Sequence, residues 1–178
     1  MTVGEHLAQQ LRSHLVTQLA DVAAMFPSKP DWCHNSAQAL VLGHGRWFRP
    51  APLPVGRTLG SPGRCFANAT RHAARHDLAY VEGFALPEAG PVLQHAWCAR
   101  RDGTVEDPTW GADGLAYLGI PFTRHYLQAQ HRRGNTHQLL FEQHRSDWEL
   151  FRFGIGEDIV EDIGELNEPI TLSKQQEN

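Results

Sequence analysis

The chain has 178 residues, which suits one domain, and 41% of them are hydrophobic, enough to build a core. Charged residues make up 20% and the formal net charge is −4, a balance that excludes wholesale disorder and a strongly basic nucleic-acid-binding surface. No stretch is long and apolar enough to cross a membrane, and the N-terminus lacks the pattern of a signal peptide. We therefore expect a cytoplasmic protein that binds neither membranes nor nucleic acid.

The N-terminal portion, about 1–45, is predicted to be helical. Residues 5–26 carry leucines at helical spacing and are followed by two prolines, so they predict an amphipathic packing helix. Residues 32–42 suggest a second, short helix. The stretch 43–63 holds much of the proline and glycine of the chain, and it predicts a loop or an edge strand.

The central portion, about 60–125, is predicted to be a helix followed by a sheet. The elements expected in order are a helix over 65–77 and strands over 78–87, 92–100 and 105–110. Asp102-Gly103 lies between the last two strands and is a hairpin signal. This order predicts an α+β domain in which the helix packs on an antiparallel sheet.

The C-terminal portion, about 126–166, is less regular in its pattern. Residues 117–132 are expected to begin as strand and become helix, and 138–154 to be partly helical. The tail, 167–178, is polar and is predicted to fray. No repeat or linker divides the chain, so one domain over 1–178 is expected.

The three cysteines are Cys33, Cys65 and Cys98. An odd, widely spaced set is not a disulfide framework and fits reduced thiols. There is no Cys-x-x-Cys pair, so a structural zinc site has little support, and we expect neither metal nor cofactor. Cys98 has the opposite strand parity to His95 and should face the core, while Cys33 is predicted to be an inert packing residue.

Cys65 stands at the start of a predicted helix, where unpaired amides and the helix dipole favour a thiolate. His95 is the candidate for a neighbouring imidazole. Such an imidazole can take the thiol proton and return it to a leaving group. Asp107 is the candidate for a carboxylate that fixes the tautomer of that imidazole. The alternative for a lone cysteine is a small buried apolar residue.

The motifs "GRCFANA", "YVEGFA", "HAW" and "DGTVEDPTW", in that order, resemble the core of the transglutaminase-like, papain-related cysteine enzymes. The resemblance spans residues 64–110. It implies a papain-like core with Cys65 as nucleophile, His95 as general base and acid, and Asp107 as orienting carboxylate. It also implies an acyl-enzyme formed on an amide, peptide or thioester of a peptide, protein or small acyl substrate, then released to water or an amine.

Other residues near these motifs are candidates for supporting roles at the site. Asp113 is the alternative orienting carboxylate, while Asp102 and Glu106 are expected to be solvated. The backbone amide of Cys65 is a natural oxyanion donor. Four side chains are candidates for a second oxyanion donor, and the sequence does not separate them: Trp32, Asn35, Gln38 and Trp47.

Eleven histidines are unusual for this length. His72 and His76 have a spacing that can bind metal, but a solvated helix face is expected since no further ligand completes a set. Four histidines and four arginines form either a basic rim for an anionic substrate or simply a solvated surface: His125, His131, His137, His144, Arg124, Arg132, Arg133 and Arg145.

Within the strands, Gly83 is predicted to allow either a close approach of backbones or a bulge. Glu82 either faces the cleft or lies on an exposed edge. Four aromatic residues are expected to line the core or the cleft: Tyr80, Phe84, Trp97 and Trp110. Of these, Trp97 is expected to shield His95 from water.

Three functions compete on this sequence. The first is a cysteine hydrolase or acyltransferase. The second is a binding protein that keeps the scaffold without catalysis, since a fold does not fix a function. The third is a metal enzyme that uses histidines and Cys65.

Overall fold

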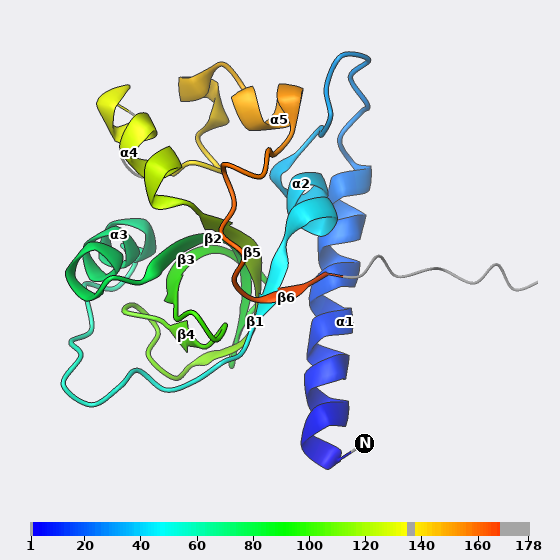
Figure 1. The fold of residues 1–178 in the computed structure, drawn as a ribbon. Coiled ribbons are helices and arrows are strands. Elements are labelled where there is room, and N and C mark those ends of the chain that lie inside the picture. Colours follow the sequence, from blue (N-terminus) through cyan, green and yellow to red (C-terminus); the bar gives the residue numbers. More distant parts are fainter. Residues whose placement is uncertain (1, 135–137, 168–178) are drawn as a thin grey trace, which may run out of the picture.

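A computed structural model describes residues 2–134 and 138–167 (Figure 1). The chain forms α1 (Val3–Ala24), α2 (Ala37–His44), β1 (Arg46–Phe48), α3 (Cys65–His76), β2 (Ala79–Pro87), β3 (Leu93–Ala99), β4 (Val105–Glu106), β5 (Gly114–Phe122), α4 (Arg124–Arg132), a 3-10 turn η1 (Gln143–Ser146), α5 (Glu149–Phe153) and β6 (Glu165–Leu166). The fold is α+β, as the sequence predicts.

The strands form one curled antiparallel sheet in the order β4-β3-β2-β5-β1-β6 (Figure 1). Its centre is the pairing of β2 with β3 and β5. Gly83 of β2 lies opposite Gly119 of β5, and a Cβ on Gly83 would meet the Leu118 carbonyl oxygen at 2.3 Å. The predicted close approach of backbones at Gly83 is thus confirmed.

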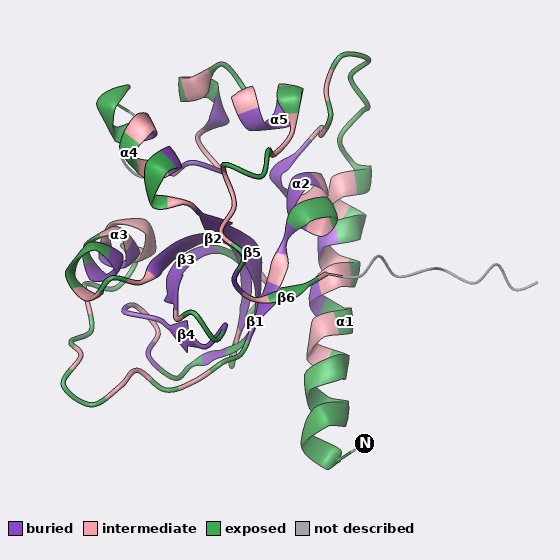
Figure 2. Ribbon diagram, in the orientation of Figure 1, coloured by how far each residue is buried: buried purple, intermediate pink, exposed green. Residues whose placement is uncertain are grey.

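The two faces of the sheet bury different cores, and Figure 2 shows the central strands β2 and β5 mostly buried, whereas the edge strand β6 is exposed. One face packs against α1, α2, α3 and the segment after α4, through side chains such as Leu15, Leu40 and Ala69. The other face is lined by Phe48, Trp97 and other residues of the curled interior. Alternate residues of a strand therefore enter different cores, as strand geometry requires.

Several predicted boundaries moved. The second helix begins at Ala37, where the Ser36 side chain accepts from the Ala39 amide, and residues 32–36 lie outside it. The predicted return strand is only Val105–Glu106, because the chain turns after it and Asp107 bridges back to Gly111. Other predicted elements, the hairpin strand β3 and the strand-to-helix passage from β5 to α4 among them, are confirmed.

The predicted tail lies mostly in 168–178, outside the described residues. Its first residue, Asn167, is held in place, because its side chain accepts from the Trp47 indole at 3.0 Å and donates to the Leu42 carbonyl at 2.8 Å. Fraying from Asn167 onward was therefore wrong for that residue.

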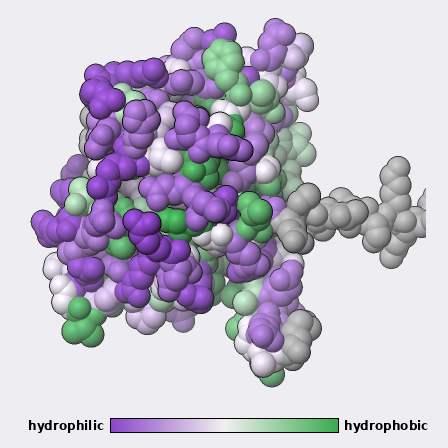
Figure 3. Space-filling model, in the orientation of Figure 1, coloured by the Kyte–Doolittle hydropathy of each residue, from purple (hydrophilic) through white to green (hydrophobic). Residues whose placement is uncertain are grey.

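The N-terminal half of α1 extends past the sheet (Figure 1) and is exposed (Figure 2). Only Leu15 and Leu19 of its predicted apolar stripe are buried, and Leu7 remains 54% exposed. The face in Figure 3 is mostly hydrophilic, with small separate hydrophobic areas. Within 2–134 and 138–167, no helix combines the length and apolar character needed to cross a membrane.

Candidate active site

Cys65 is the first residue of α3 and is half-buried. It follows the proline- and glycine-rich stretch, in which Gly63 adopts a φ of 72° that favours glycine. In the described residues, the N-cap Arg64 makes no side-chain capping bond to the helix start. The first amides of α3 are thus left to interact with an anion at this end, where the dipole favours negative charge.

His95 and Asp107 are in direct contact. Nε2 of His95 lies 2.7 Å from Oδ2 of Asp107, and the two side chains are 1% and 0% exposed. His95 comes from β3, and Asp107 is the first residue after β4, so the short hairpin brings them together. Because Asp107 engages Nε2, the ring nitrogen left for a second partner is Nδ1.

Cys65 is that second partner. Burial lowers the pKa of His95, but hydrogen bonds with Asp107 and with the Cys65 side chain, together with their charges, outweigh it and raise the pKa above its ordinary value. All three predicted site residues are therefore in one chain of contacts, with the imidazole in the middle. Both partners favour a protonated imidazole.

α3 packs on the sheet, as the sequence predicts, and it does so on the face opposite to that of His95. Ala69 of α3 packs with Ala96 and Cys98 on one face, whereas His95 has the parity of Trp97 on the other. Among the described strands, β4 pairs with β3 only at Cys98 and Ala99. The thiol and the imidazole thus meet around the edge of β3, beyond the end of β4.

Asp107 is held by four donors. Its Oδ1 accepts from the amides of Thr109 and Trp110 at 2.8 and 3.0 Å. Its Oδ2, besides contacting His95, accepts from the Tyr117 hydroxyl at 3.0 Å. Burial raises the pKa of Asp107, but the His95 contact and the two amides outweigh it and hold that pKa below its usual value. The carboxylate is therefore ionised and fixed in orientation.

Aromatic rings enclose the imidazole. Trp110 stacks on His95 with ring centroids 3.7 Å apart, whereas Trp97 is 6.1 Å away. The sequence predicts that Trp97 shields His95, but the closer ring is that of Trp110. Tyr117 lies 6.3 Å from His95 and 5.0 Å from Trp97, measured between ring centroids. Rings at these positions exclude water from the histidine and keep its plane fixed.

One stripe of α3 is fastened to the chain around Asp107. Asn68 lies one turn after Cys65, and its amide donates to the Thr109 hydroxyl at 3.0 Å and to the Ser61 carbonyl at 2.9 Å. His72 lies a further turn along and contacts Glu106 at 3.0 Å. Because residues 65, 68 and 72 share a helix face, the same packing sets the distance from the thiol to the carboxylate turn.

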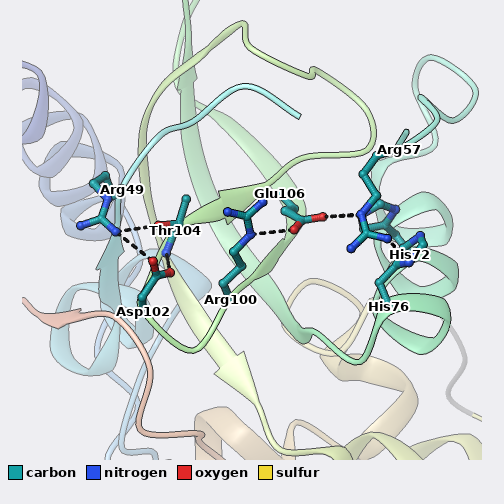
Figure 4. A network of polar contacts seen from close by, with 8 residues as sticks. All are labelled: Arg49, Arg57, His72, His76, Arg100, Asp102, Thr104 and Glu106. Atoms are coloured by element: carbon teal, nitrogen blue, oxygen red, sulfur yellow. Dashed lines mark hydrogen bonds and ion pairs between the residues drawn. The ribbon is translucent and has the colours of Figure 1, made fainter. Parts of the chain in front are cut away.

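Glu106 is the centre of a buried polar network, shown in Figure 4. Its side chain is 2% exposed and lies 2.7 Å from Arg100 Nε, 3.0 Å from His72 Nε2 and 3.3 Å from Arg57 Nε. Arg57 also contacts His76. Solvated positions for Glu106 and His72 were wrong: Glu106 pairs with Cys98 and so faces α3, away from Asp107.

The remaining predicted positions divide clearly. Asp113 is exposed and Asp107 is the carboxylate in contact with His95, while Asp102 is an exposed turn residue paired with Arg49. Cys98 is buried as predicted, with its thiol donating to the Ala69 carbonyl at 3.2 Å. Cys33 is exposed, so a packing role for it was wrong.

The four candidate side chains for a second oxyanion donor make their contacts elsewhere in the fold. Asn35 donates to the Phe26 carbonyl, and the Trp47 indole donates to Asn167. Trp32 packs on Trp148 at 5.6 Å, and Gln38 lies in α2. The amide of Cys65 remains the donor nearest the thiol.

Glu82 is completely buried, so an exposed edge position was wrong. It accepts from the Tyr80 hydroxyl at 2.7 Å and from the amides of Leu139 and Leu140 at 2.7 and 2.8 Å. Burial raises the pKa of Glu82 to about 7, although these three donors pull it down. One sequence signal points to this residue: it is a carboxylate inside an apolar strand.

The predicted basic rim is dispersed. His125, His131 and His144 are exposed, and His137 lies outside the described residues. Arg124 pairs with Asp77 and Arg133 with Glu149, so part of this positive charge is neutralised locally.

Across 2–134 and 138–167, no group of three or more His, Cys, Asp and Glu residues is arranged to hold a metal ion. Comparisons with family models, with curated proteins and with solved structures gave no match to this chain.

Proposed function

We propose that this chain is a cysteine-dependent hydrolase or acyltransferase with a transglutaminase-like, papain-related core, acting on an amide, peptide or thioester through an acyl-enzyme on Cys65. The observation that carries the proposal is the position of His95 between the Cys65 thiol and the Asp107 carboxylate. A buried imidazole joined to both groups is what a nucleophilic cysteine requires.

The proposed reaction begins with proton transfer from the Cys65 thiol to His95. The sulfur then forms a bond to the carbonyl carbon of the substrate, and the carbonyl oxygen takes up the negative charge. The Cys65 amide at the start of α3 is placed to donate to that oxygen. When the carbon–nitrogen or carbon–sulfur bond breaks, His95 returns the proton to the leaving group, and a thioester remains.

In the second half, water or an amine attacks the thioester while His95 takes its proton. The proton then passes to the Cys65 sulfur as it leaves, which regenerates the thiol. Asp107 holds the imidazole in position throughout, and Trp110 covers its ring. Whether water or an amine is the acceptor separates hydrolysis from acyl transfer.

Alkylation by iodoacetamide tests the proposal, because the chain carries its own reference thiol. Cys33 is more exposed than Cys65, and Cys98 is buried. If Cys65 is activated, it should react near pH 7 at least about tenfold faster than Cys33, despite its lower exposure. Peptide mapping identifies the labelled thiol, with Cys33→Ser and Cys65→Ala as the two matched variants.

A Cys65 that reacts no faster than Cys33 would contradict the enzyme proposal. That result would favour the second candidate, a binding protein on the same scaffold.

A further inference from the structure

An aromatic cluster lies on the α3 side of the sheet, next to the nucleophile. Phe66 follows Cys65 in the first turn of α3, and its ring meets Phe141 edge to face at 5.8 Å. Phe141 meets Phe84 of β2 in the same way at 5.4 Å. Phe84 is buried, whereas Phe66 and Phe141 are only half-buried. The cluster thus has one buried ring, that of Phe84, and two partly exposed rings, those of Phe66 and Phe141.

Further apolar surface stands beside the histidine. Leu93, two residues before His95 in β3, is 43% exposed, and Val92 is half-buried against the same core as Phe84. Gly83 pairs with His95 and Phe84 with Gln94, so the Phe84 ring lies near the level of the imidazole along the strands but on the opposite, α3-facing side of the sheet. Partly exposed apolar side chains therefore flank both Cys65 and His95.

The segment that supplies Phe141 is held from below by Glu82. The amides of Leu139 and Leu140 both donate to this carboxyl group, and Leu140 is fully buried. Irregular backbone can be buried only where its amides find acceptors, and one carboxyl group satisfies two in succession. Phe141 is the next residue, so its position follows from this anchoring.

Tyr80, which donates to Glu82, interacts with both Glu82 and Cys65. The pKa of Tyr80 is raised first by burial and then by the negative charge of Glu82, with a smaller effect from Cys65. No ion pair forms with Glu82 among the described residues, so its visible partners are hydroxyl and amide donors. The role of Glu82 is therefore to hold the backbone at Leu139 and Leu140 in place.

We propose that the Phe66–Phe141 surface is the acyl-side subsite of the Cys65 centre, that it selects substrates with an apolar group beside the reacting carbonyl, and that Glu82 positions it. This inference rests on the proposed function. Phe141 is the specificity-determining residue and Glu82 a positioning residue that acts through the Leu139 and Leu140 amides.

The test compares two electrophiles with the same reactive group, iodoacetamide and N-benzyliodoacetamide, on the full chain. The ratio of their second-order rate constants at Cys65 removes the reactivity of the thiol itself. Burial of a benzyl group should favour the benzyl reagent about tenfold in the wild type. Free cysteine in the same buffer gives the intrinsic ratio, and Cys33 gives the ratio for an exposed thiol.

Phe141→Ser should bring the ratio at Cys65 down to that of free cysteine. Glu82→Gln should lower the ratio in the same direction. Phe153→Ser, which removes a 71% exposed ring from α5, is the matched control and should keep the wild-type ratio. Phe141 is only half-buried, so Phe141→Ser should disturb the core less than a change at the buried Glu82. It therefore still tests the subsite if Glu82→Gln fails to fold.

The outcomes separate the two proposals. A fast iodoacetamide reaction with no benzyl preference, or a preference that survives Phe141→Ser, would overturn the subsite and keep the enzyme. A slow iodoacetamide reaction at Cys65 would overturn the proposed function itself.

Discussion

Tyr117 donates its hydroxyl proton to Oδ2 of Asp107 across 3.0 Å. The same oxygen lies 2.7 Å from His95 Nε2, so the tyrosine and the histidine share one acceptor. Burial and the Asp107 charge raise the pKa of Tyr117 far above its ordinary value, so the phenol stays a donor at every working pH. Tyr117 is therefore a fixed partner that sets the orientation of the carboxylate.

Tyr117→Phe should weaken catalysis without unfolding the protein. The lost hydrogen bond is worth about 1–2 kcal/mol, because its acceptor is charged. If that loss appears in the transition state, Cys65-dependent turnover of p-nitrophenyl acetate should fall about tenfold. Tyr126→Phe, which removes a buried hydroxyl in α4, is the control and should keep turnover. A Tyr117→Phe enzyme with wild-type turnover would show that the two Asp107 amide contacts suffice.

The positions of Cys65, His95 and Asp107 could be predicted because each lies at a local signal: a helix start, a β-rich run and the end of a hairpin. The same local patterns could not give Tyr117, since its contact with Asp107 depends on the curl that folds β5 toward the hairpin. Asn68 was hidden for a similar reason: its acceptor on Thr109 lies 41 residues away in the chain.

Burial of charge was the main point that sequence reasoning missed. Glu106 looked solvated because it alternates with Asp107, but both faces of this sheet are covered, so alternation decides which core a side chain enters. Arg57 from the loop before α3, His72 from α3 and Arg100 just after β3 make that burial tolerable, and no local pattern connects them.

Glu106→Gln should destabilise the fold by about 2–3 kcal/mol, because it removes the shared acceptor of a buried network. Burial raises the pKa of Glu106, but His72 and the arginines outweigh it and lower that pKa. The stabilisation is therefore present above the unfolded pKa near 4.5 and is lost as pH falls through the lower folded value.

Urea denaturation of wild type and Glu106→Gln at several pH values measures this difference. Asp102→Asn is the matched control within Figure 4, since its ion pair with Arg49 is exposed and should be worth less than about 1 kcal/mol. Equal losses in the two variants would contradict a special role for Glu106.

Glu82→Gln should change how stability depends on pH. The pKa of Glu82 rises from 4.5 to about 7 on folding because of burial, so the folded state holds its proton more tightly than the unfolded state. The free energy of unfolding should therefore fall by about 3 kcal/mol as pH rises from 4.5 to 7, and then level off.

The glutamine variant lacks this ionisation, so its stability relative to wild type should increase between pH 5 and pH 8. Comparing the two proteins at each pH cancels every other titrating group that they share. A constant difference across that range would mean that Glu82 does not titrate there.

Substitutions of the three central residues should reduce turnover to different extents. Cys65→Ala should abolish turnover of p-nitrophenyl acetate beyond background, because it removes the sulfur that forms the thioester. His95→Ala should come close to that, since the proton acceptor and the partner of the thiol are lost together. Asp107→Asn should retain measurable turnover. In a serine triad the equivalent change costs about 10⁴, and the cost here should be smaller because a thiol needs less help from its base.

Asp107→Asn should also lower the pKa of His95, since the carboxylate is among the groups that raise it. Histidine NMR titration reads this directly, with Asp113→Asn as the control because Asp113 is exposed. Melting curves should show all three variants folded, which ties any loss of turnover to chemistry. An Asp107→Asn enzyme with the turnover and the His95 pKa of wild type would mean that stacking on Trp110 alone orients the imidazole.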